Sequence, residues 1–62
     1  MNGSSMINDA AKEGDHLLVE FKGGKMYCFV GAGHLENELR SAPSAGRFFH
    51  ARIRGRFTSY EV

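Results

Sequence analysis

A pair of adjacent glycines between two runs of β-prone residues most constrains the fold of this chain. Residues 16–21 read His-Leu-Leu-Val-Glu-Phe, residues 26–30 read Met-Tyr-Cys-Phe-Val, and Gly23-Gly24 lies between the runs. Glycine adopts positive φ without a steric penalty, which the tight turns of β-hairpins require. The pattern therefore predicts an antiparallel hairpin with Gly23-Gly24 as a two-residue loop.

A two-residue loop also fixes which side chains share a face of the hairpin. It places Phe21 opposite Met26, and strand alternation then divides the side chains between two faces. We expect a wholly apolar core face formed by Leu17, Val19, Phe21, Met26, Cys28 and Val30. The opposite face would then hold His16, Leu18, Glu20, Tyr27 and Phe29. Because that second face is rich in aromatic and apolar groups, we expect something to cover it at least part of the time.

The N-terminal part of the chain carries a weaker pattern. Residues 5–11 fit either a short strand or an irregular lead-in, and Gly14-Asp15 is typical of a turn. Residues 1–4 are small and polar, so we expect a flexible N-terminus followed by one domain over residues 5–62. A domain of this size buries only roughly 60% of its unfolded surface. Its single cysteine cannot form an internal disulfide, so we expect a homo-oligomer.

Residues 34–40 predict a first short helix. Leu35 and Leu39 are four residues apart and therefore share one face of a helix. Glu36 and Arg40 have the same spacing, which suits an ion pair, and their order matches the helix dipole.

A second short helix is predicted to begin after Ser44, a good N-cap residue, and to end at about Arg54 with Gly55 as its stop. Phe49 and Ile53 form its inward stripe, and residues 57–62 fit a last strand or a docked tail. The expected fold class is α+β: a small antiparallel meander of about three strands followed by two short helices packed on one face.

The motifs of the chain resemble those of the KTSC domain, a small domain found at the C-terminus of some lysyl-tRNA synthetases and as stand-alone bacterial and phage proteins. The shared motifs are Tyr27-x-Phe29, Ala42-x-Ser44-x-Gly46, Phe49-His50 and residues 53–57. The chain departs from the usual pattern at His50, where the family has Asn, and at Gly31-Ala32, where it has Val-Pro. The resemblance implies the same α+β fold, no enzymatic activity and a suggested role in RNA binding.

Residues 40–57 contain five arginines, three phenylalanines and no acidic residue. Arginine forks match phosphate groups, and aromatic rings stack on bases. The candidate ligand-binding residues are Arg47, Arg52, Arg54 and Arg56 for phosphate, and Tyr27 and Phe29 for bases. Two other interpretations stay open: the arginines line solvated helix faces, and the two rings pack in the fold or between subunits.

Catalytic and metal-binding chemistry is not expected. The three histidines lack metal-ligand spacing, and Cys28 alternates onto the expected core face as a small hydrophobic residue. We therefore predict a protein that is not an enzyme, with no metal and no cofactor. The chain has no apolar signal segment or membrane-length run, so a cytoplasmic protein without a membrane partner is expected.

These features favour a non-enzymatic binding module for an anionic, base-containing ligand, either RNA or a nucleotide. The alternative is a protein–protein inhibitor of the kind encoded by phages or mobile elements, or an oligomer that sequesters a nucleotide and so acts on a host system. The arginines and rings would then be interface anchors.

Overall fold

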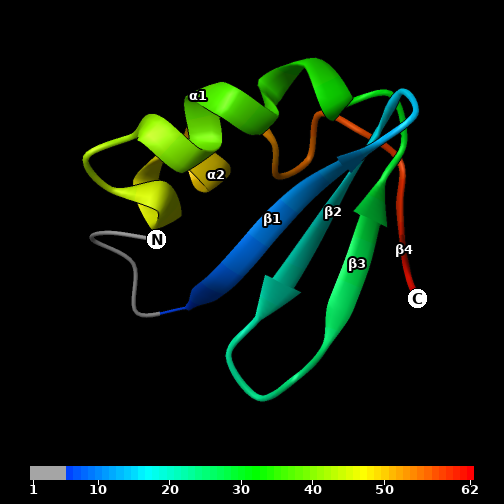
Figure 1. Ribbon diagram of the computed structural model, residues 1–62, viewed down its shortest axis with the longest axis horizontal. Coiled ribbons are helices and arrows are strands. Elements are labelled where there is room, and N and C mark those ends of the chain that lie inside the picture. The colour runs from blue at the N-terminus through cyan, green and yellow to red at the C-terminus, as the bar shows by residue number, and fades with distance from the viewer. Residues whose placement is uncertain (1–5) are drawn as a thin grey trace.

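The computed structural model describes residues 6–62, so the expected flexible segment at residues 1–4 lies outside the described residues. Four strands form one antiparallel sheet in the order β1-β2-β3-β4 (Figure 1). The strands are β1 (Ile7–Glu13), β2 (His16–Phe21), β3 (Met26–Phe29) and β4 (Ser59–Glu61). A short 3-10 helix (Gly33–Leu35) and helices α1 (Glu36–Ser41) and α2 (Ala45–Arg52) lie between β3 and β4 in the chain.

The α+β class is confirmed, and the sheet has one strand more than the expected meander of about three. The additional strand, β4, follows the helices and pairs antiparallel with β3. Backbone hydrogen bonds of 2.8 Å at both ends, from Val30 N to Thr58 O and from Val62 N to Met26 O, extend this pairing. Of the two alternatives for residues 57–62, a last strand or a docked tail, the strand is therefore confirmed, at Ser59–Glu61.

The predicted register of the β2–β3 hairpin is wrong by one residue. The Phe21 N–H donates to the Lys25 oxygen at 2.8 Å, and the Gly24 N–H donates to the Phe21 oxygen at 3.1 Å. The loop therefore contains three residues, Lys22, Gly23 and Gly24, and both glycines have positive φ. Tyr27 consequently lies opposite Val19 in the sheet.

A shift of one residue moves every side chain of β3 to the other face of the sheet. Tyr27 and Phe29 face the helices together with the alternating apolar residues of β2, so the predicted second face, in which the two rings join Leu18 and Glu20, does not exist. Cys28 is buried as expected, but on the face away from the helices, where it lies opposite Leu18 and Tyr60. We call this second face, formed by the side chains that point away from the helices, the open face.

The two helices cover the other face of the sheet and close the core. Leu35, Leu39, Phe49 and Ile53 are buried, which confirms both predicted inward stripes. The Ser44 hydroxyl accepts a hydrogen bond from the Arg47 N–H at 3.3 Å and caps α2, also as predicted. No helix within residues 6–62 is long and apolar enough to cross a membrane.

A bulge in β1 adapts the N-terminal strand to this core. Ile7 lies opposite Phe21 and Asp9 lies opposite Glu20, so one extra residue is inserted between them. As a result Ile7 and Ala10 are both buried, although they are three residues apart. The weak alternation of residues 5–11 in the sequence has this cause.

Candidate functional site

A hollow of about 220 Å³ opens between the helix-covered face of the sheet and the turn that follows α2. Three of the six predicted ligand-binding residues, Tyr27, Phe29 and Arg54, lie at this position. We call it the aromatic hollow. Its lining residues are Phe21, Tyr27, Phe29, Phe49, Arg54, Gly55 and Ser59.

The walls of the hollow are aromatic rings in edge-to-face contact. The Phe49 ring lies 5.4 Å from the Phe21 ring and 5.3 Å from the Phe29 ring, with interplanar angles of 78° and 77°. The Tyr27 ring lies 5.8 Å from that of Phe21. Phe29 and Phe49 are buried, whereas Phe21 and Tyr27 are half-buried and present part of their surface to the hollow. Such contacts fix ring orientation, so the wall is preformed.

The turn after α2 places Arg54 at the hollow. The Arg54 N–H donates to the Phe49 oxygen at 2.9 Å, and Gly55 follows with a φ of 76°. A guanidinium nitrogen of Arg54 lies 3.3 Å from Nδ1 of His50, one helical turn earlier. Within residues 6–62 no carboxylate forms a salt bridge with Arg54. Its charge is therefore available to an anion.

The other predicted arginines do not converge on this point. Arg52 stacks over the Phe48 ring at 5.3 Å from its centroid and lies 3.8 Å from Glu38, so it serves the contact between α1 and α2. Arg56 donates through Nε to the Ala51 oxygen at 3.1 Å. Arg47 is exposed in the first turn of α2 and does not line the hollow. Of the four predicted arginines, only Arg54 therefore lines the hollow.

Sequence reasoning missed part of this site. Phe49 was expected only as a core residue, and Phe21 was placed on the same face as Met26. The alternation of residues 27–29 predicted that the Tyr27 and Phe29 rings share one face of the sheet, but it did not show which face. Ser59 carried no signal, because it joins the hollow only through the pairing of β4 with β3.

The histidines occupy three separate places in the fold. His16 accepts a hydrogen bond on Nδ1 from the Gly31 N–H at 3.2 Å, and the His34 ring lies 6.0 Å from that of Phe57. His50 contacts Arg54, as described above. In the described part of the chain no three His, Cys, Asp or Glu side chains gather in a group that could hold a metal ion.

The KTSC domain family matches residues 3–57 of this 62-residue chain. The chain belongs to the KTSC domain family. No curated protein matches it significantly. Tyr27, Phe29 and Phe49, which come from two of the motifs shared with KTSC domains, all line the aromatic hollow.

Proposed function

We propose that this KTSC domain is a non-enzymatic binding module for a ligand that joins a planar base to an anionic group, as in RNA or a nucleotide. The observation that carries the proposal is the position of Arg54 beside a preformed wall of aromatic rings. A guanidinium donates to phosphate oxygens, and an aromatic ring stacks on any base. The two halves of the ligand thus have adjacent partners.

The size of the hollow suits a single base. Pockets for drug-sized molecules occupy about 300–1,000 Å³, and this hollow of about 220 Å³ is smaller. The base would lie against Tyr27 and Phe21, the half-buried rings of the wall. The Ser59 hydroxyl, on β4, is a neutral group able to donate to or accept from the base edge. A nucleotide would use the whole site, and RNA would insert one unstacked base.

The test is calorimetric titration with a nucleoside monophosphate and with a short single-stranded RNA. Arg54→Ala should weaken binding at least about tenfold, because a charge-assisted hydrogen bond to phosphate contributes about 1.5–3 kcal/mol. Arg47→Ala is the matched control, because Arg47 is an exposed arginine on α2 and lies outside the hollow. We expect less than about twofold change for the control.

Tyr27→Leu tests the stacking half of the proposal. Leucine keeps an apolar side chain on the wall but removes the ring, and base stacking on an aromatic side chain contributes about 1–3 kcal/mol. Binding should therefore fall about five- to a hundredfold. Equal affinities of the wild type, Arg54→Ala and Tyr27→Leu would refute the hollow as the ligand site. Equal losses in Arg54→Ala and Arg47→Ala would point instead to diffuse electrostatic binding.

A further inference from the structure

We propose that the open face of the sheet is a self-association surface, on which two copies of this chain stack sheet against sheet. This inference is independent of the proposed function, because the aromatic hollow lies on the helix-covered side. It rests on which side chains are exposed and on how charges are distributed over the four strands.

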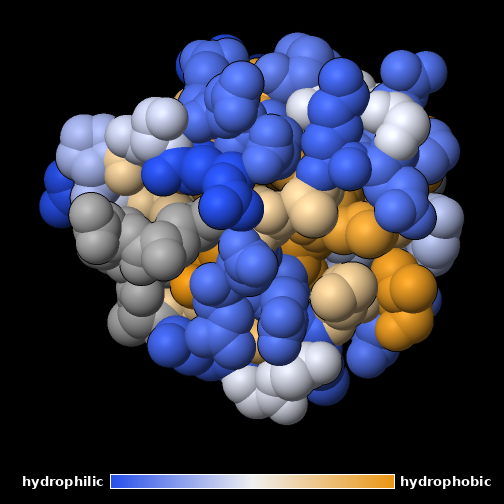
Figure 2. Space-filling view, in the orientation of Figure 1, coloured by the Kyte–Doolittle hydropathy of each residue, from blue (hydrophilic) through white to orange (hydrophobic). Residues whose placement is uncertain are grey.

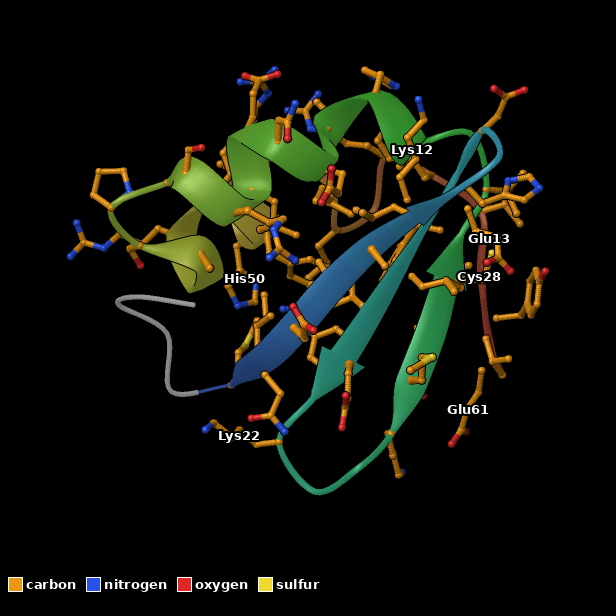
Figure 3. The ribbon with its side chains drawn as sticks, in the orientation of Figure 1. Lys12, Glu13, Lys22, Cys28, His50 and Glu61 are labelled. Atoms are coloured by element: carbon orange, nitrogen blue, oxygen red, sulfur yellow. The ribbon has the colours of Figure 1, made fainter. Side chains whose placement is uncertain are left out.

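The exposed large apolar side chains of the described residues all lie on the open face. They are Val30, Tyr60 and Val62, with 37%, 54% and 69% of their surface accessible. Tyr60 lies opposite Cys28, and Val62 and Val30 continue the same alternation through the backbone hydrogen bonds at the ends of β4. In Figure 3, Cys28 lies on β3 beside β4. Exposed apolar groups gathered on one face mark an interaction surface.

Half-buried Leu18 and Met26 continue this apolar surface across β2 and β3. Figure 2 shows it as a band of hydrophobic atoms bordered by hydrophilic ones. A shallow hollow of about 80 Å³ lies on the β1–β2 side of this surface, and its lining includes Asp9 and Glu20 beside Leu18 and Met26. These two acidic residues make the hollow a poor seat for an apolar side chain, so the apolar contact lies on the β3–β4 side. A two-fold contact joins the same patch of both copies, and an apolar patch is complementary to itself.

The carboxylates of the open face are kept to one side of it. Asp9, Glu13 and Glu20 occupy β1 and β2, whereas the exposed apolar side chains belong to β3, β4 and their ends. Asp9 is also paired with Arg40 at 3.0 Å. A two-fold axis through the β3–β4 half would place the carboxylates of the two copies at opposite rims, in water. An apolar centre with a charged rim is the usual composition of a protein interface.

The area of the face sets the expected strength of association. Four strands about 4.8 Å apart, with three rows of side chains about 7 Å apart, cover about 400 Å² per copy, which is an upper limit for a contact centred on β3 and β4. A stable interface of standard size buries about 800 Å² per partner. The stacked dimer should therefore be reversible and depend on protein concentration.

The experiment is sedimentation velocity of the full chain from about 10 µM to about 1 mM, the range in which association of this strength is visible. Val30→Glu and Tyr60→Glu each place a carboxylate in the apolar centre, from two different segments. Ala51→Glu is the matched control, because Ala51 is exposed on α2, on the opposite side of the molecule. We expect both face variants to raise the dimer dissociation constant at least about tenfold and the control to leave it within about twofold.

Methyl NMR of the wild-type protein over a dilution series is a second test, and its result does not depend on whether any variant folds. The methyl signals of Leu18, Met26 and Val30 should shift with concentration, while those of the buried Leu39 and Ile53 stay constant. A wild type that stays monomeric at about 1 mM overturns the proposal and leaves the face to a different partner. A dimer that survives both face variants, or that the control weakens equally, overturns the assignment to this face. Tyr60→Glu should bind a nucleotide with the affinity of the wild type, because Tyr60 does not line the aromatic hollow. Failure of the self-association proposal can therefore be told apart from failure of the ligand-site proposal.

Discussion

The backbone N–H of Gly33 donates a hydrogen bond of 2.8 Å to the carbonyl oxygen of Asp15. This contact joins the start of the 3-10 helix to the β1–β2 turn. A Cβ atom at position 33 would lie 2.9 Å from both the carbonyl carbon and the oxygen of Asp15. Because these are backbone atoms, they cannot move aside cheaply, and only glycine fits. Gly31, with a φ of 80°, completes the joint by donating its N–H to His16.

Gly33→Ala should therefore destabilise the domain by about 1–3 kcal/mol, the range found for overpacked sites. Urea unfolding followed by circular dichroism measures the loss. The control is Asn37→Ala on the exposed side of α1, which should change stability by less than about 0.5 kcal/mol. Equal urea midpoints for Gly33→Ala and the wild type would mean that the contact between Gly33 and the β1–β2 turn can widen without loss of stability.

Arg40 connects the helices to the edge strand β1. One guanidinium nitrogen donates to the Ala10 oxygen at 2.7 Å and to Asp9 at 3.0 Å, and Nε lies 3.4 Å from Glu36. Arg52, by comparison, stacks over the Phe48 ring and forms a 3.8 Å ion pair with Glu38, in which both side chains are about half exposed. Exposed ion pairs contribute little, whereas a charged donor to a backbone carbonyl contributes more.

We expect Arg40→Ala to lower the free energy of unfolding by about 1–2 kcal/mol and Arg52→Ala by less than about 1 kcal/mol. Thermal or urea unfolding of the two variants makes a matched comparison, because the same residue type is removed from each helix. Raising the salt concentration should reduce the Arg40 effect only partly, because its hydrogen bond to Ala10 is to a neutral group. An Arg52→Ala loss as large as that of Arg40→Ala would contradict this ranking.

Tyr60 has a pKa raised above its ordinary value, first by a hydrogen bond with the Cys28 side chain, then by the charge of the Cys28 thiolate and by partial desolvation. A raised pKa means that the folded chain holds the phenol proton more tightly than the unfolded chain. Its contribution to stability is thus complete below the unfolded pKa of about 10 and is lost as pH rises through the folded value.

Titration of the Tyr60 ring carbons by ¹³C NMR in dilute protein measures this shift. Cys28→Ala removes both the hydrogen bond and the thiolate, so the pKa of Tyr60 should fall toward its ordinary value. A pKa of Tyr60 that is the same in Cys28→Ala and the wild type would show that the cysteine is not the cause.

Local sequence patterns were sufficient for the existence of the central hairpin and the two helices, but not for the register of the hairpin. Ser44 marked the start of α2 because capping depends on neighbouring residues alone, whereas α2 ends at Arg52, about two residues before its predicted end, and Gly55 lies in the turn that follows. The predicted register of the hairpin was wrong because a Gly-Gly pair suits a three-residue loop as well as a two-residue loop. Alternation could not decide between them, because both sides of residues 26–30 are largely apolar. The aromatic hollow and the open face depend on that register and on β4, and so could not be derived locally.

Loop length is therefore the feature that assigns each side chain of β3 to its face. Deleting Gly24 would leave two residues, favour the alternative register and turn Tyr27 and Phe29 away from the helices. Full burial of one such side chain contributes about 1.5–3 kcal/mol, and a domain this small has little stability in reserve. We expect the deletion variant to lose its dispersed amide NMR spectrum. Gly24→Asn keeps the loop length and a residue that tolerates positive φ, so it should fold with a loss below about 2 kcal/mol. A deletion variant with a native-like spectrum and Tyr27 still in contact with Phe21 would show that core packing, not the loop, sets the register.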